Sequence, residues 1–262
     1  MFVGRFGSCE LGLVADFFRS HGKESLVDSE FARIMNNKGG FYPCTDGTIA
    51  RFSELYRSLM RDIDILGSWR LEELEFKRDL RRAVRIPLGD IEPYSHDDPW
   101  TSALEGKKVL VVNPLVDTIR KQYAIRRSLF LDPSILPDFT LLTYKPVFEF
   151  NREDHSHESW FDALDLMKKD IAAMDFEVVV LGCGPFGMPL AAHAKSLGRQ
   201  AIVMGGATQV WFGIRGGRWD GDPFFRGLYN EHWVYPSEAE TPKNAQSLED
   251  GCYWKASCPG LS

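Results

Sequence analysis

The chain has 262 residues, of which 44% are hydrophobic and 26% charged, so a sizeable core is available and a disordered protein is excluded. The net charge of −6 disfavours a general nucleic-acid binder, because such proteins are more often basic. The sequence contains no run of about 18 apolar residues, no signal peptide pattern and no CxxC pair among its five cysteines. We therefore expect a cytoplasmic protein without a transmembrane segment, a disulfide framework or a zinc knuckle.

In the first hundred residues, the predicted elements are short and separated by loops. Apolar residues at helical or strand spacing define most of them, and the helix over 71–82 is instead charged and expected to be solvated. The Pro- and Asp-rich segment 90–100 reads as a connection. The region of about 20–100 is therefore expected to be a less regular helical insertion. The predicted elements are strands 2–6 and 63–66 and helices 11–19, 48–61 and 71–82.

Strand and helix patterns alternate more regularly between residues 106 and 215. The region 216–262 is rich in Trp, Pro and Gly, and we expect an irregular surface segment there. The predicted elements are strands 108–112, 140–144, 177–181 and 201–204 and helices 117–129, 159–174 and 186–197. Alternating strands and helices predict an α/β fold, with a Rossmann-like, mostly parallel sheet flanked by helices in a single domain over 1–262.

Glycine-rich or polar turns follow three of these strands. Residues 182–187 form a GxGxxG segment between a strand and a helix, where backbone N–H groups could approach a phosphate. A dinucleotide site would also need an acid at the end of the next strand, and 203–205 holds none. The alternatives are a tight turn without a ligand and another kind of phosphate or nucleotide crevice. Residues at this edge expected to line such a crevice are Asn113, Thr118, Gly182, Gly184, Gly205, Gly206 and Gln209.

The end of the first strand carries a second group of candidate residues. Arg5 offers a bidentate contact to a phosphate or carboxylate, and Ser8 is a suitable N-cap for the next helix. Glu10 could bind a hard cation, which prefers oxygen ligands. Alternatively, Glu10 only complements the helix dipole.

Other polar and aromatic segments have a structural and a functional interpretation. Trp219, and with it Trp233, could stack on a base or sugar, while Arg215 or Arg218 could neutralise a diphosphate; the alternative is a surface loop with an anchoring Trp. Glu231 is a candidate second acid. The acidic HxH segment 154–158 has metal-ligand residue types but reads more simply as a solvated loop. His193 is expected to be a satisfied core histidine.

The segment Arg5-Phe6-Gly7-Ser8-Cys9-Glu10 resembles the R-[FY]-G-D-G-E signature that opens the GT-D-type glycosyltransferase domain. The order and spacing of further segments resemble a bacterial branch of the same family, so the resemblance spans nearly the whole chain. These segments are 109–114, 119–122, 159–164, 181–184, 205–206 and 229–244.

The resemblance implies a Rossmann-like enzyme that transfers a sugar from a nucleotide diphosphate-sugar to a glycan or glycoprotein acceptor. The family typically holds a divalent cation, Mn²⁺ or Mg²⁺, through an Asp-x-Glu motif. Glu10 matches the family's Glu, whereas Ser8 stands where the Asp belongs, and a hydroxyl is a much weaker ligand than a carboxylate. The cation would then be bound by Glu10 and the diphosphate, recruit another acid, or be replaced by Arg5 and Arg215.

Candidate roles follow from the residues and the resemblance together. Glu10 and Glu231 are the candidate catalytic acids, and Glu10 is the candidate metal ligand. The candidate donor-binding residues are Arg5, Gly7, Ser8, Asn113, Thr118, Gly182, Gly184, Gly205, Gly206, Gln209, Arg215 and Trp219. A non-catalytic nucleotide or sugar-phosphate binding protein is the main alternative. An adenosylmethionine-dependent methyltransferase is less favoured, because the strand over 201–204 does not end in an acid.

Overall fold

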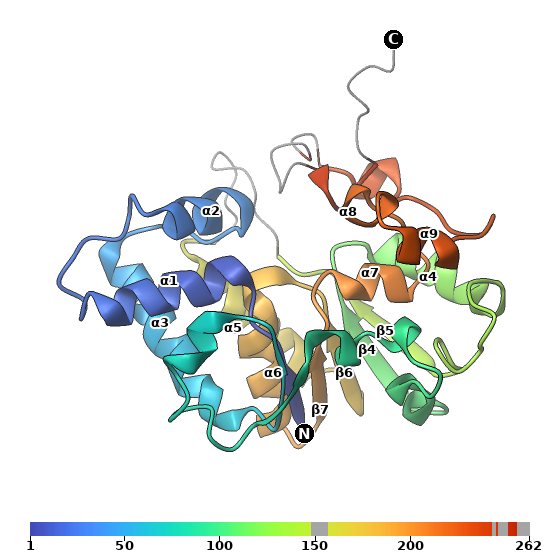
Figure 1. Ribbon diagram of the computed structural model, residues 1–262, viewed down its shortest axis with the longest axis horizontal. Helices are drawn as coiled ribbons and strands as arrows, with labels where there is room; N and C mark the ends of the chain where they lie inside the picture. The colour runs from blue at the N-terminus through green and yellow to red at the C-terminus, as the bar shows by residue number, and fades with distance from the viewer. Residues whose placement is uncertain (148–156, 243–244, 246–250, 256–262) are drawn as a thin grey trace, which may run out of the picture.

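A seven-stranded sheet, with all strands parallel, forms the centre of the molecule (Figure 1). The computed structural model describes residues 1–147, 157–242, 245 and 251–255. The strand order is β3-β2-β1-β7-β6-β4-β5. The strands are β1 (Phe2–Gly4), β2 (Ile65–Ser68), β3 (Val84–Pro87), β4 (Lys108–Val112), β5 (Thr140–Tyr144), β6 (Val178–Leu181) and β7 (Gln200–Val203). The predicted Rossmann-like α/β fold is therefore confirmed.

Helices cover both faces of the sheet (Figure 1). One face carries α1 (Ser8–Arg19), α2 (Glu30–Lys38), α3 (Asp46–Leu59), α5 (Trp160–Ala172) and α6 (Gly187–Ser196). The other carries α4 (Val116–Ala124), α7 (Ala207–Trp211), α8 (Gly217–Asp220) and α9 (Pro223–Leu228). Short 3-10 helices are η1 (Met60–Asp62), η2 (Leu71–Leu74), η3 (Leu88–Ile91), η4 (Pro93–Ser95), η5 (Trp100–Leu104), η6 (Arg126–Ser128), η7 (Gly184–Phe186) and η8 (Glu238–Glu240).

The central strands are apolar because both faces of the sheet are covered. In β4, Val109 and Val111 point into one core, and Leu110 and Val112 into the other. All four side chains are fully buried. Such a strand has a continuous hydrophobic run rather than an alternating one, which is why the run 108–112 predicted it correctly.

The region 20–100 differs most from its prediction. The charged helix predicted over 71–82 is wrong: only η2 forms there, followed by turns. The buried Glu73 carboxylate accepts hydrogen bonds from the backbone N–H groups of Trp69 and Arg70, which ends the preceding loop. The prediction also missed α2 and β3. Because β2 and β3 belong to the main sheet, this region extends the sheet and is not only a helical insertion.

The connections after β1 and β7 define a crevice at the carboxyl edge of the sheet. These strands are neighbours, yet β1 leads into α1 on one face and β7 leads into α7 on the other. Ligands of open α/β sheets bind where the connections diverge in this way, beyond the carboxyl ends of the strands. Among the described residues, no helix is both long and apolar enough to cross a membrane.

Candidate functional site

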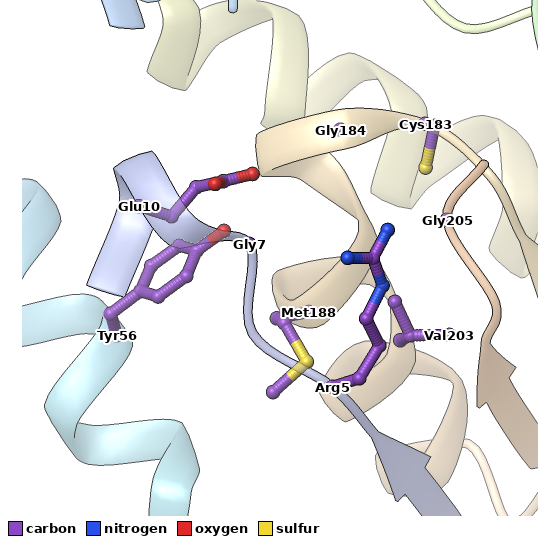
Figure 2. Close-up of a pocket in the computed structure, with 9 residues that line it drawn as sticks. All are labelled: Arg5, Gly7, Glu10, Tyr56, Cys183, Gly184, Met188, Val203 and Gly205. Carbon is purple, nitrogen blue, oxygen red and sulfur yellow. The ribbon is translucent and has the colours of Figure 1, made fainter. Parts of the chain in front are cut away.

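A small open cleft lies at this crevice between β1 and β7 (Figure 2). It is lined by Arg5, Gly7, Glu10, Tyr56, Cys183, Gly184, Met188, Val203 and Gly205. The structure thus brings together five residues predicted from separate turns: Arg5, Gly7, Glu10, Gly184 and Gly205. Met188 and Val203 supply an apolar wall, and the polar groups converge from the α1 side and from the two glycine turns.

Arg5 extends across the end of β1 to the turn that follows β7. Gly205 has a left-handed backbone with φ +59°, and a Cβ atom at this position would overlap the Arg5 guanidinium. The glycine therefore allows the guanidinium to lie directly against the backbone. No hydrogen bond or ion pair joins Arg5 to any of the described residues. Its planar donors can therefore take an anion in the cleft.

Glu10 lies in the first turn of α1, and its carboxylate points toward the turn at Gly184 (Figure 2). A Cβ atom at Gly7 would overlap this carboxylate, so the glycine makes room for it. Gly7 is also the N-cap of α1, with no side-chain cap, and Ser8 is the first helical residue. The prediction that Ser8 caps the helix is therefore wrong, and Ser8 does not line the cleft.

Tyr56 and Cys183 form the inner wall of the cleft. The Tyr56 hydroxyl donates to the Pro185 carbonyl oxygen at 2.7 Å, which joins α3 to the turn after β6. Burial raises the pKa of Tyr56, and the nearby Glu10 charge raises it further. Burial also raises the pKa of the Cys183 thiol. Both groups therefore stay neutral near pH 7, which gives Cys183 little nucleophilic character.

The predicted donor-binding residues Asn113 and Gln209 are buried and already hydrogen-bonded. The Asn113 amide donates to the Gly182 carbonyl at 3.2 Å and accepts from the Leu115 N–H at 2.9 Å. The Gln209 amide donates to the carbonyl oxygens of Arg215 and Tyr253 at 2.6 and 2.8 Å. These side chains hold the turns in place and do not line the cleft.

Gly182 and Gly206 serve close packing. A Cβ atom at Gly182 would lie 2.6 Å from the Asn113 amide nitrogen and 2.7 Å from the Thr208 hydroxyl. At Gly206 it would lie 3.1 Å from the Tyr253 ring. Neither glycine lines the cleft, so their predicted role in donor binding is replaced by a role in packing.

Thr118 is hydrogen-bonded to the carboxylate of Glu240. Glu240 is buried and accepts hydrogen bonds from the Asp117 and Thr118 N–H groups at 2.8 and 3.1 Å and from the Thr118 hydroxyl. The Ser237 hydroxyl donates to it at 2.9 Å. Glu240 thus takes the position at the start of α4 where an anion would be favoured. The prediction that Thr118 binds the donor is therefore wrong.

Arg215 contacts residues of the C-terminal segment. Its guanidinium pairs with Asp220 at 3.3 Å and lies over the rings of Tyr229 and Tyr235 at 4.6 and 4.7 Å. These contacts fix the C-terminal segment against the sheet. Arg215 does not line the cleft, so the prediction that it neutralises a diphosphate there is not supported by its position.

Trp219 and Trp233 are buried core residues, only 6% and 5% exposed. The Trp219 ring packs against Phe225 and Tyr253, and the Trp233 indole N–H donates to the Leu129 carbonyl at 3.0 Å. The prediction that they stack on a base or sugar is wrong, because the segment after Gly216 folds inward over the second core rather than forming a surface loop.

Glu231 lies outside the cleft, with a side chain that is 83% exposed. Its neighbour Asn230 donates to the carbonyl oxygens of Ser128 and Leu129, near the carboxyl end of α4. Glu231 itself faces His232 at 3.7 Å. The predicted second acid therefore does not lie in the cleft that contains Glu10.

A divalent cation would find one protein carboxylate lining the cleft. Within the part of the chain that the structure describes, no three His, Cys, Asp or Glu residues come together. Hard cations take six or more oxygen ligands, so Glu10 alone does not make a protein-only metal site. Of the HxH segment, 154–156 lie outside the described residues. His193 is half-buried, and its Nε2 lies 3.0 Å from the Lys168 carbonyl, as expected for a satisfied histidine.

Glu92 is an acid near Arg5 that the sequence did not single out. It is half-buried beyond the end of β3, next to Tyr94. Burial raises the pKa of Glu92, and the Tyr94 hydroxyl and the Arg5 charge offset this only in part. Because the sequence does not predict β3, it also does not predict that the segment 90–100 follows a strand of the sheet and lies near its carboxyl edge.

The raised pKa of Glu92 predicts a pH-dependent effect on stability. The folded protein favours the neutral acid, so its ionisation costs stability as the pH rises through the folded pKa. Glu92→Gln is expected to unfold at a higher temperature than wild type at pH 8. The difference should vanish below the ordinary Glu pKa of about 4.3. Thermal unfolding from pH 4 to 8, with exposed Glu105→Gln as control, measures this; a lower melting temperature for Glu92→Gln at pH 8 would contradict it.

Comparisons of the chain with models of known protein families, with curated proteins and with solved structures find no match. The function is therefore inferred from the cleft and from the motif that forms it.

Proposed function

We propose that the protein is a glycosyltransferase that transfers a sugar from a nucleotide diphosphate-sugar to a glycan or glycoprotein acceptor. The observation that supports this best is the position of Arg5 and Glu10. One short segment, which resembles the opening signature of GT-D-type domains, directs both side chains into a single cleft at the carboxyl edge of a parallel sheet. The Arg5 guanidinium can bind an anionic donor, and the Glu10 carboxylate can take part in a reaction that transfers a proton.

The diphosphate of the donor would lie against Arg5 and the turn at Gly184. The guanidinium provides bidentate hydrogen bonds to phosphate oxygens. At this turn Pro185 has no N–H, and the N–H groups of Phe186 and Gly187 donate to the Cys183 and Gly184 carbonyl oxygens, so the Gly184 N–H is the donor available to a phosphate. The cleft is small, so most of the donor would extend over its open side.

In the reaction, the bond between the anomeric carbon and the diphosphate oxygen breaks, and the acceptor oxygen bonds to that carbon. Negative charge develops on the leaving diphosphate, where Arg5 and the helix start stabilise it. The acceptor hydroxyl loses its proton, and we assign the Glu10 carboxylate as the base that accepts it. A divalent cation, Mn²⁺ or Mg²⁺, would share the charge of the diphosphate, held by Glu10 together with the donor's own oxygens.

A non-catalytic nucleotide or sugar-phosphate binding protein is the second candidate. It is favoured by Ser8, which replaces a carboxylate of the family motif, and by the single carboxylate that lines the cleft. Binding of a nucleotide sugar without nucleotide release, even with acceptor extracts, would identify this candidate. We also propose a cytoplasmic location, which the five scattered cysteines without a CxxC pair favour.

Donor binding is tested by calorimetric titration with the nucleoside diphosphates and their common sugar derivatives, with and without Mn²⁺, while nucleotide release is followed in parallel. Binding of at least one donor is expected. Arg5→Ala should weaken it by about 10- to 100-fold, because a hydrogen-bonded charge contact is lost. The free energy of unfolding of Arg5→Ala should stay close to the wild-type value, because Arg5 makes no hydrogen bond or ion pair with any described residue.

Arg120→Ala is the matched control, because this exposed arginine pairs only with Asp117 one turn away on α4. It should bind the donor as wild type does. The proposal fails if no common donor binds the wild-type protein, or if Arg5→Ala binds as tightly as wild type.

A further inference from the structure

Trp69 is the one strongly exposed tryptophan, and it lies beside the cleft. It directly follows β2, the neighbour of β1, and its indole N–H donates to the Phe6 carbonyl oxygen at 2.8 Å. Trp69 is 44% exposed, whereas the other six tryptophans are buried or half-buried. Phe6 lies between the cleft residues Arg5 and Gly7. An open aromatic surface therefore adjoins the segment that carries the anion-binding arginine.

A buried carboxylate holds the loop that presents this indole. Glu73 is 0% exposed, and it accepts hydrogen bonds from the N–H groups of Trp69 and Arg70, each at 3.1 Å. The Ser68 hydroxyl also donates to it, and Arg85 pairs with it at 3.2 Å. A buried charge is tolerated when it is fully paired in this way. These bonds fix the loop backbone on both sides of the Trp69 side chain.

The ring of Trp69 is fixed as well. Its N–H is anchored on Phe6, and the Arg70 guanidinium lies over it at 5.1 Å from the centroid. Arg70 is itself held by Glu72 at 2.6 Å. A planar group that is already immobile loses little conformational entropy when a ligand stacks on it. Trp69 therefore has the properties of a preorganised stacking surface.

We propose that Trp69 is the platform on which the nucleobase of the donor stacks. This rests on the proposed function, since it assumes that the diphosphate lies at Arg5. A nucleoside diphosphate bound there would project its nucleoside out of the small cleft, and the exposed Trp69 follows β2, the next strand along the same edge. Every base has a π-face that can stack on an indole, so this contact adds affinity for nucleotides over simple phosphates.

The test compares pyrophosphate with UDP, GDP, ADP, CDP and dTDP, titrated into wild type, Trp69→Ala, Trp69→Phe and Leu71→Ala. Leu71 is the matched control, because it is an exposed apolar residue two positions along the chain. For the nucleotide that binds best, Trp69→Ala should lower the affinity by about 10-fold or more. Pyrophosphate affinity should not change. Trp69→Phe should keep part of the gain, and Leu71→Ala should behave as wild type.

Tryptophan fluorescence gives a second readout. Nucleotide binding should quench the emission of wild type, and most of this quenching should be absent in Trp69→Phe. Equal nucleotide affinity in Trp69→Ala and wild type would overturn the inference while the proposed function stands. An equal loss for pyrophosphate and nucleotide would also overturn it, because the loop would then act only by shaping the cleft. If neither pyrophosphate nor any of the nucleotides binds wild type, the proposed function is wrong, and the inference about Trp69 is wrong as well.

Discussion

Glu10→Gln is expected to lower the rate of sugar transfer by about 10²- to 10⁴-fold, the range that follows loss of a general acid or base. Glu10 is the carboxylate that lines the cleft, and glutamine keeps its shape while removing its charge and its capacity to take a proton. Gly7 leaves space for the side chain, so the variant should fold as wild type does.

The measurement is nucleotide release from the donor that binds best, in the presence of acceptor extract, with Asp16→Asn as the control. Asp16 lies on the same helix and pairs with Arg19 on the surface, so its substitution makes the same chemical change away from the cleft. Asp16→Asn should retain the wild-type rate. Transfer by Glu10→Gln within about threefold of wild type would show that Glu10 takes no part in the chemistry.

Glu240→Ala should have the largest effect on stability, a loss of about 2–4 kcal/mol in the free energy of unfolding. The carboxylate accepts from two N–H groups at the start of α4 and from two hydroxyl groups, and two of these four bonds are buried. Its removal leaves these donors without a partner and releases the C-terminal segment from α4. The indole N–H of Trp254 donates to the backbone carbonyl oxygen of Glu240, a separate contact that the alanine variant keeps.

Denaturant unfolding measures this effect, and Glu238→Ala serves as the control because Glu238 is an exposed acid in the same short helix, η8. The control should unfold within about 0.5 kcal/mol of wild type. A loss in Glu240→Ala no larger than in the control would mean that water replaces the carboxylate at α4. The folded Glu240→Ala protein should still bind the donor, because α4 begins outside the cleft.

The centre of the fold could be predicted from the sequence because its strands are covered on both faces. The run 108–112 matches β4 at both ends, and 177–181 and 201–204 differ from β6 and β7 by one residue. Continuous apolar runs between helical segments have few other interpretations. Edge elements lack this signal: Val84 of β3 is 63% exposed, and its strand is defined by pairing with β2 rather than by composition.

The helix predicted over 71–82 failed for a tertiary reason. Phe76 and Leu80 are buried at helical spacing, so the local pattern resembles an amphipathic helix. The buried Glu73 instead binds the backbone of the preceding loop, and turns bring the two apolar residues to the core. Glu73 makes these bonds to residues three and four before it, at the start of η2, and the tertiary contacts of the region are the pairs of Asp79 with Arg57 and Arg61.

The site could be predicted only where backbone geometry sets its position. Arg5, Glu10, Gly184 and Gly205 follow the carboxyl ends of neighbouring strands, and the fold brings such turns together. Thr118 and Trp219 were assigned wrongly because sequence does not show whether a side chain is used within the protein. In both cases a residue of the C-terminal segment contacts the side chain: Glu240 accepts a hydrogen bond from the Thr118 hydroxyl, and the Tyr253 ring packs against Trp219.

A crystal structure with a bound nucleoside diphosphate and Mn²⁺ tests the central claim most directly. The account predicts that the diphosphate lies between the Arg5 guanidinium and the turn at Gly184, within reach of Glu10, with the base over Trp69. A nucleotide bound at another edge of the sheet, with Arg5 and Glu10 in contact with solvent only, would contradict it.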